Sequence, residues 1–370
     1  MELECPYPAG IQHFRPPYCP RVDCPSRAGD GPAFRFRSRG RYRRACDRRI
    51  VRRFHCHVCC RSFSVQTFRV DYQLKRPELT AAVFDAFVSK VTQRQTARCQ
   101  NCTRATVRRR LILLSRHARE FHDAVLKRAR ARGSLRGRFQ LDELETFERD
   151  RRLCPVTMPV LIHEESRFVL HVEAVALAAR GGLSPRLLVR KKQLEAKVGV
   201  RRSGSREAVK RCFEVLAAAL GPSTGAVLAT DQKPAYSAVL SAVMGGRCAH
   251  ERHPGRAART VSNPLWPINH TLAMLRDGLS RLVRRSWGVS KERDWLARHA
   301  WIWIAYRNYI RAFTNRKKRT TSALRAGLVS QPISKNKFFE WRVPPLCWTT
   351  SEGSQSSGSL CAGDLRGPLP

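Results

Sequence analysis

Acidic residues are scarce in this sequence. Its 370 residues include 29 Asp and Glu against 70 Lys and Arg, which gives a formal net charge of +41. A basic excess of this size predicts a polyanionic partner, and nucleic acid is the usual one. A hydrophobic content of 42% and regular apolar periodicity indicate a folded protein, which excludes a basic disordered tail as a description of the whole chain.

Long uncharged runs are also missing. A membrane surface is the competing polyanion, but no stretch approaches the roughly 18 to 20 uncharged residues that span a bilayer. The most apolar segment, WIWIAYRNYI at 301–310, is interrupted by Arg307, and we expect it to pack in the core. The N-terminal MELECPYPAG has neither a basic start nor an apolar core, so we expect no secretion signal. These features predict a cytoplasmic, nucleoid-associated protein with no membrane partner.

The 14 cysteines outside a secreted context indicate metal binding or burial more than disulfides. Residues 1–76 contain two closely spaced pairs, Cys19 with Cys24 and Cys56 with Cys59. Two such pairs on separate turns can supply the four thiolates that Zn²⁺ binds tetrahedrally. The metal would hold together a zinc ribbon too small to fold on hydrophobic burial alone. Cys46 and Cys60 are alternative ligands, and four incidental buried cysteines are the alternative to a metal site.

Residues 77–132 have helical periodicity. The run TQRQTARCQNCTRATVRRRL predicts a helix, a tight turn near Asn101 and a second helix from Thr103. In a helix-turn-helix the second helix lies in the major groove of DNA. A solvated basic helix on a helical hairpin is the alternative. Cys99 and Cys102 lack a second pair nearby, and we interpret them as packing residues. The arginines expected to contact DNA here are Arg104, Arg108, Arg109 and Arg110.

Residues 133–345 predict a different architecture. Three strand-like runs, RFQLDELETF, PVTMPVLIHE and SRFVLHVEAVALAA, precede alternating helix and strand, with two strongly helical runs at 265–286 and 291–314. This order predicts an α/β fold, a mixed sheet flanked by helices. The Ser/Gly-rich residues 346–370 are expected to be a disordered tail.

Two acids stand where strand-like runs give way to charge. Asp142 lies within LDELETF, and Asp231 ends the run GAVLATD. Carboxylates on adjacent strands can share two divalent cations, the arrangement used in two-metal phosphoryl transfer. The alternative is that both acids are turn residues or helix N-caps.

Several motifs, in their order along the chain, resemble bacterial and archaeal insertion-sequence transposases of the IS-one-like superfamily. They are CPRVDCPS, RRFHCHVCCRSFSVQTF, LDELETF, VLATDQKPAY, INHTLAMLRDGLSRLVRRSWGVSK, NRKKRTTSALRAGL and FFEWR. The resemblance extends from Cys19 to Arg342. It implies a ribonuclease-H-like core in which two Asp and one Glu bind two Mg²⁺ ions.

Carried onto this sequence, the resemblance assigns the metal ligands to Asp142, Asp231 and position 269, which is Asn269 instead of Glu. An amide oxygen can ligate Mg²⁺ but carries no charge. Some members of the superfamily have Asn at this position, so the resemblance still implies an active enzyme. Glu251 precedes the helix, and Asp277 lies about 80° around it from Asn269, so both are poorer third ligands.

Basic residues follow Asn269 on the same predicted helix. Arg276 shares its face and matches a basic residue that such transposases carry. The arginines expected to grip DNA phosphates here are Arg276, Arg281, Arg284 and Arg285. Three histidines lie near the predicted site: His250, His253 and His270. They could assist metal or phosphate binding, but a lone histidine is more often a surface or packing residue.

The sequence therefore predicts a DNA transposase. Its zinc ribbon and helix-turn-helix would bind terminal inverted repeats of double-stranded DNA. Its core would cut 3′ ends and transfer them to target DNA, acting as a homo-multimer. The alternatives are a non-catalytic zinc-ribbon DNA-binding regulator, an inactive transposase derivative marked by Asn269, and a structure-specific nuclease with the same core.

Overall fold

In the computed structural model of the chain, the described residues are 14–341 except 22, 29, 73, 180, 222–223, 259, 284–288 and 315–319. The tail at 346–370 therefore lies outside them. Within the described part of the chain, no helix combines the length and apolar character needed to cross a membrane.

The N-terminal module is a small antiparallel sheet. Strands β1 (Phe36–Arg43), β2 (Ile50–Cys56) and β3 (Ser62–Ser64) lie in that order, between the short helices η1 (Pro25–Arg27) and η2 (Val65–Phe68). Phe14, Phe54 and Phe68 form its own buried cluster, separate from the main core. A cluster this small gives limited hydrophobic stabilisation, so the module needs another source of stability.

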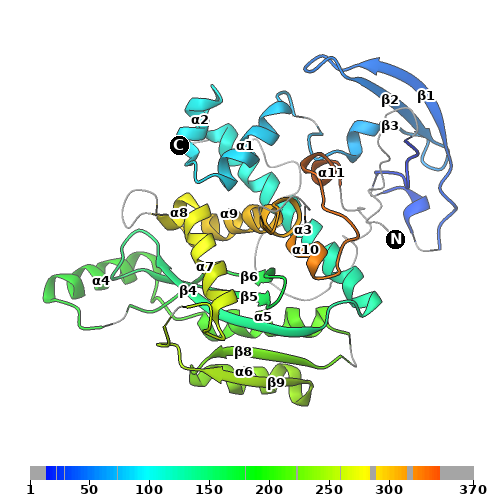
Figure 1. Cartoon of the computed structure of the whole chain (residues 1–370). Helices are drawn as coiled ribbons and strands as arrows, with labels where there is room; N and C mark the ends of the chain where they lie inside the picture. Colours follow the sequence, from blue (N-terminus) through cyan, green and yellow to red (C-terminus); the bar gives the residue numbers. More distant parts are fainter. Residues whose placement is uncertain are drawn as a thin grey trace.

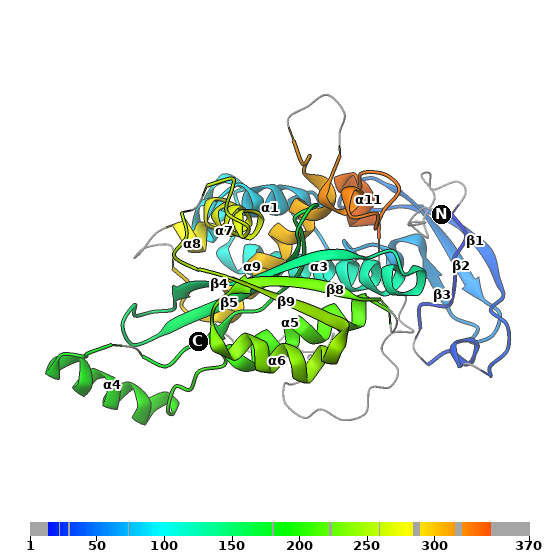
Figure 2. The ribbon, with the colours of Figure 1, turned by 60° about the horizontal axis from the view of Figure 1, so that its bottom comes forward.

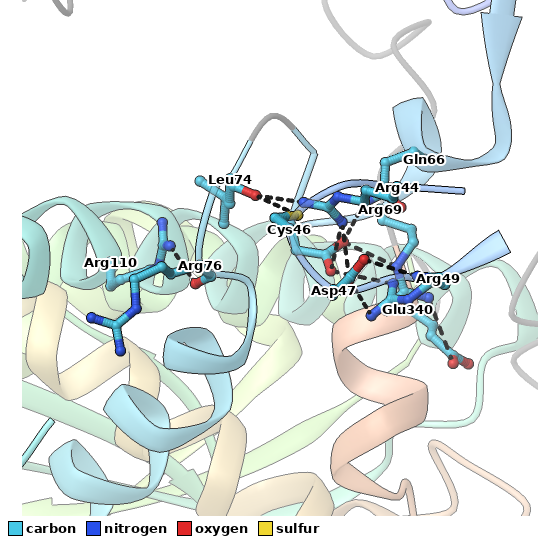
Figure 3. Close-up of polar contacts among 11 residues, drawn as sticks. Arg44, Cys46, Asp47, Arg49, Gln66, Arg69, Leu74, Arg76, Arg110 and Glu340 are labelled. Carbon is cyan, nitrogen blue, oxygen red and sulfur yellow. Dashed lines mark hydrogen bonds and ion pairs between the residues drawn. The ribbon is translucent and has the colours of Figure 1, made fainter. Parts of the chain in front are cut away.

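A buried carboxylate, Asp71, organises the end of this module, and a neighbouring arginine contacts the C-terminal part of the described chain. The Asp71 side chain, 7% exposed, accepts hydrogen bonds from Gln66 Nε2 (2.8 Å) and Arg69 Nε (3.0 Å), and pairs with Arg49 at 3.4 Å. Arg69 also lies 3.9 Å from Glu340, near the C-terminal end of the described chain. Figure 3 shows Arg69 and Glu340 beside Arg49 and Asp47.

Three helices follow: α1 (Glu78–Val88), α2 (Gln93–Cys99) and α3 (Arg104–Arg132). Thr103 caps α3 by accepting the N–H of Thr106, and Gly133 ends it in the left-handed conformation. Asn101 has a positive φ of 42° in the α2–α3 turn. Buried residues of α1 and α3 belong to the same hydrophobic cluster as the main sheet. The two helices and their turn are as expected, whereas DNA binding by them stays a prediction.

The main sheet is mixed, with strand order β6-β5-β4-β8-β9. β4 (Gly137–Phe147) pairs antiparallel with β5 (Pro155–His163), which pairs antiparallel with β6 (Phe168–Val172). On its other side β4 is parallel to β8 (Ala226–Asp231), which is parallel to β9 (Cys248–His253). The short β7 (Val175–Ala176) pairs with β5. This confirms an α/β fold with a mixed sheet, and its order is compatible with a ribonuclease-H-like fold.

Helices cover both faces of this sheet (Figure 2). On one face lie α5 (Ser205–Ala219) and α6 (Pro234–Met244), and on the other lies α7 (Trp266–Gly278). The remaining elements are α4 (Pro185–Val198), η3 (Gly245–Arg247), α8 (Ser280–Val283), α9 (Arg293–Ala305), the π-helical turn η4 (Tyr306–Ile310), α10 (Ser322–Arg325) and α11 (Lys335–Glu340). No residue of α4 is buried, and this helix projects from the body (Figure 1).

The outer edge of β6 is covered by side chains instead of another strand. Asn308 in η4 accepts the N–H of Val169 at 3.0 Å and donates to its carbonyl at 2.9 Å. The apolar segment 301–310 that contains it is largely buried, including Trp303 and Tyr309, which confirms its expected place in the core.

The helix expected over 265–286 is interrupted. The structure ends α7 at Gly278 and begins α8 at Ser280. A Cβ added to Gly278 would lie 2.1 Å from Trp303 Nε1 in α9, so this close approach requires glycine. Arg281 therefore lies on α8, beyond the helix that carries Asn269.

Candidate metal and nucleic-acid sites

Parallel pairing places Asp142 and Asp231 on neighbouring strands. Leu141 of β4 lies opposite Thr230 of β8, and the two aspartates come next on each strand. Leu141 and Thr230 are fully buried. Side chains alternate between the faces of a strand, so both aspartates point to the other face, where each is half-buried.

The helix that carries Asn269 begins on this same face. Gln140, two residues before Asp142, is fully buried. Its Nε2 donates to the carbonyl of Pro264 at 2.7 Å, and its Oε1 accepts the N–H of Ile268 at 3.0 Å. Residues 140 and 142 share a face of β4, so Gln140 fixes the first turn of α7 beside Asp142. Asn269, half-buried, is the residue after Ile268.

Local contacts hold each aspartate. Asp142 Oδ1 accepts the N–H of Glu143 at 2.7 Å, and Asp231 Oδ1 accepts the N–H of Lys233 at 3.1 Å. Lys233, not Asp231, is the N-cap of α6, so the N-cap alternative does not hold for Asp231. Gly255 lies close by, and a Cβ there would be 3.4 Å from that of Asp231. The glycine leaves space above the carboxylate that a side chain would fill.

Glu143 points the opposite way and is held by four side chains. It accepts hydrogen bonds from Thr157 (2.8 Å), Ser205 (2.8 Å) and Tyr236 (2.9 Å), and it pairs with the Lys233 ammonium. Burial disfavours its charge, but the hydrogen bond and charge of Lys233 outweigh burial and lower the pKa of Glu143. Its role is to position the β8–α6 turn behind Asp231. The sequence pattern did not identify Glu143 as a site residue, although it directly follows Asp142 in LDELETF.

The acids weighed as substitutes for Asn269 are engaged elsewhere. Asp277 is exposed and pairs with Lys90. The carboxylate of Glu251 in β9 accepts hydrogen bonds from Nη1 and Nη2 of Arg138, at 2.9 and 2.5 Å. This pairing lowers the pKa of Glu251. Among the described residues, only the four-cysteine cluster unites three or more His, Cys, Asp or Glu side chains at ligand spacing. A third oxygen ligand for the two aspartates would thus come from a neutral group such as Asn269.

The four expected zinc ligands converge. They are Cys19, Cys24, Cys56 and Cys59, whose sulfurs all lie within 4.8 Å of one another. The Sγ atoms of Cys19 and Cys59 are 3.7 Å apart, and those of Cys24 and Cys56 are 3.8 Å apart. A tetrahedron with Zn–S distances of about 2.3 Å has edges of about 3.8 Å. The cluster could therefore bind Zn²⁺. Cys46 and Cys60 are exposed and contact backbone carbonyls instead.

The arginines of α3 divide into two groups. Arg104, Arg108 and Arg109 are exposed, and Arg108 also stacks on Trp295, with its Cζ 4.8 Å from the ring centroid. Arg110 is only 6% exposed and donates to the carbonyl of Arg76 at 2.9 Å. The structure corrects the expected exposure of Arg110, which fixes the connection before α1 and faces no solvent phosphate.

The arginines after Asn269 also differ from one another. Arg276 is exposed at the end of α7 and donates to the carbonyl of Glu145 at 3.2 Å. Arg281 is half-buried and donates to Ser290 at 3.2 Å, and desolvation lowers its pKa to about 10. Contact of Arg281 with DNA stays a prediction. Arg284 and Arg285 lie outside the described residues.

The three histidines occupy different environments. His250 bonds Thr230 at 2.9 Å and Ser237 at 3.2 Å on the α6 side of the sheet, as a packing residue does. His253 lies opposite Asp231 in the β8–β9 register, on the same face as the aspartates. His270 packs against Trp266 on α7, with ring centroids 5.0 Å apart.

A pocket of about 460 Å³ lies away from the aspartates, between α4, the β4–β5 connection and the start of α9. Its lining combines acids with bases, including Glu148, Arg201 and Arg293. Glu148 bonds both arginines, with Arg201 at 2.7 Å and Arg293 at 3.1 Å. Neither Asp142, Asp231 nor Asn269 lines this pocket.

Comparisons with known proteins leave the family open. No family model matches the chain, and no curated protein matches it. The solved structures that match include the catalytic domain of Mos1 mariner transposase, at 14% identity and a TM-score of 0.21, covering 52% of this chain and 90% of that one. A likeness at this TM-score carries no argument, so the resemblance to IS-one-like transposases stays a prediction.

Proposed function

We propose that this chain is a DNA transposase that uses divalent metal ions at Asp142 and Asp231. The observation that carries the proposal is the parallel register of β4 and β8, which brings both aspartates to one face of the sheet. Gln140 anchors α7 beside them through two hydrogen bonds. Asp142, Asp231 and Asn269 then supply carboxylate and amide oxygens, the ligands that Mg²⁺ prefers.

The residues present fit two-metal phosphoryl transfer. Mg²⁺ ions bound there would activate the attacking hydroxyl and stabilise the leaving oxygen. The chain's own part is to hold the start of α7 beside Asp142 through Gln140, and to hold the turn after Asp231 through Glu143 and Lys233. The +41 net charge favours DNA as the polyanion. Exposed Arg104, Arg108, Arg109 and Arg276 are the proposed contacts to its phosphates.

The proposal is tested by nicking and strand transfer on duplex DNA that carries the repeats flanking the gene. The wild-type chain should require Mg²⁺ or Mn²⁺, and Asp231→Asn should lower the rate by at least about 100-fold, the upper range for groups that only orient a metal ligand. Asp277→Asn is the matched control, since it removes one exposed acid from α7, and it should cleave normally. DNA binding without metal-dependent cleavage would favour the zinc-ribbon regulator.

Whether Asn269 ligates metal distinguishes an active enzyme from an inactive transposase derivative. If its amide oxygen ligates metal, Asn269→Ala should raise the metal concentration needed for half-maximal cleavage. Asn269→Glu should lower that concentration, because a carboxylate adds charge to the site. Equal metal dependence in the wild type and Asn269→Ala would remove Asn269 from the ligand set.

A further inference from the structure

Three arginines surround one aromatic ring beside α7. The Cζ atoms of Arg167, Arg307 and Arg325 lie 5.1, 5.5 and 4.4 Å from the centroid of Phe313. Arg167 also lies 4.4 Å from the ring centroid of Trp266, the first residue of α7. Aromatic faces attract cations, but three like charges around a single ring repel one another.

These arginines have no described counter-ion. Within the described residues, neither they nor the neighbouring Arg311 form an ion pair with a carboxylate. Burial, and then the charges of Arg311 and Arg167, lower the pKa of Arg307 to about 10. We call Arg167, Arg307, Arg311 and Arg325 the arginine cluster.

Two buried nitrogens at the cluster have no hydrogen-bond partner among the described residues. Arg307 is 3% exposed, and its Nη1 donates to Ser322 at 3.0 Å while its Nε has no partner. His270 Nδ1 is likewise buried without a partner. A buried unpaired guanidinium is unfavourable unless an anion completes the site.

We propose that the arginine cluster binds a backbone phosphate of the DNA next to the cutting site. Arginine suits this ligand because its planar guanidinium donates to phosphate in pairs. The position fits as well: His270 directly follows Asn269, about 100° around α7, so the cluster and the aspartates flank the same helix. The inference rests on the proposed function only in taking DNA as the ligand.

The test measures DNA affinity of the full chain against salt, without added Mg²⁺. Arg325→Gln and Arg311→Gln change the exposed members of the cluster, which limits damage to the fold. Each should weaken binding about 3- to 30-fold and reduce the slope of log Kd against log salt by about one, as loss of one phosphate contact does. Arg119→Gln is the matched control, an exposed arginine stacked on Trp301 at 5.5 Å, and should leave the slope unchanged.

Thermal unfolding distinguishes a binding role from a structural one. Without DNA, Arg325→Gln should keep or raise the melting temperature, because it relieves repulsion around Phe313; a clear fall would overturn the proposal. An unchanged salt slope with intact metal-dependent cleavage would overturn it while the transposase proposal stands. A reduced salt slope in the variants, with no metal-dependent cleavage by the wild-type chain, would support DNA binding by the arginine cluster and overturn the transposase proposal. Inorganic phosphate that raises the melting temperature without any change in DNA slope would assign the cluster to free phosphate and overturn the DNA site.

Discussion

Glu143 shows how a single residue can support a metal site without facing it. Its partners come from β5, from α5 and from the start of α6. Lys233, one of these partners, also donates its backbone N–H to Asp231. The position of the Asp231 carboxylate therefore depends on a charge pair on the opposite face of the sheet.

Glu143→Gln should lower the free energy of unfolding by about 1 to 2 kcal/mol, because it removes the charge that pairs with the partly exposed Lys233 ammonium from a buried, hydrogen-bonded carboxylate. Urea unfolding at neutral pH measures the change. Glu214→Gln is the control, since Glu214 pairs with Lys210 on the exposed side of α5. Exposed pairs contribute about 0.5 kcal/mol or less, so equal losses in the two variants would contradict this account of Glu143.

At the residue scale, the sequence predicted best those residues whose chemical type and spacing together indicate a shared ligand. The four-cysteine cluster follows from pair spacing, because zinc needs four thiolates close together. Adjacent placement of Asp142 and Asp231 follows from their positions in strand-like runs. Arg110 could not be identified as buried, because a local pattern does not reveal which face of a basic helix another segment covers.

At the scale of elements, Asp71 links the connection between β1 and β2 to the segment around η2. Burial disfavours its charge, but its arginine partners, Arg69 above all, outweigh that effect and lower the pKa of Asp71. Its folded-state pKa therefore lies below the unfolded value of about 3.9. The stabilisation it gives is complete above the unfolded value and is lost as the pH falls through the folded one.

Asp71→Asn should destabilise the chain at pH 7 by about 1 to 3 kcal/mol, since it removes a buried carboxylate that accepts from Gln66 and Arg69 and pairs with Arg49. Below pH 4 the difference from the wild type should shrink, because the native carboxyl is then increasingly protonated. Urea midpoints at pH 7 and pH 3.5 test both statements. Asp85→Asn, an exposed pair with Lys335, is the control. A difference from the wild type that grows on acidification would show the opposite sign of linkage.

Some elements were not predicted from the sequence, because contacts with distant segments, and not the local residue pattern, determine their structure. β9, with the sequence CAHERH, is too polar to read as a buried strand, yet it pairs along its length with β8. α4 was not predicted either, and it buries no residue. The break between α7 and α8 depends on contact of Gly278 with Trp303, which no local pattern encodes.

At the scale of the whole molecule, the N-terminal module and the main core are distinct hydrophobic units. The clusters around Phe54 and around the zinc cysteines share no buried residue with the main core. Loss of metal should therefore unfold the module and leave the main sheet folded.

Purified protein should contain about one zinc per chain. Cys56→Ser should lose the metal and make the N-terminal 76 residues sensitive to limited proteolysis, while near-UV circular dichroism from the tryptophans of the core persists. Cys60→Ser is the control, since Cys60 is exposed and outside the cluster. Full zinc content in Cys56→Ser would exclude the four-cysteine site.

The side-chain amide of Asn308 also affects how copies of this chain could associate through the edge of the sheet. By bonding both backbone groups of Val169, it occupies positions that a neighbouring strand would use. An exposed edge strand is a template for self-association and aggregation. The sheet is thus closed to strand addition at Val169, and an assembly that extended it would have to begin at the opposite margin, along β9.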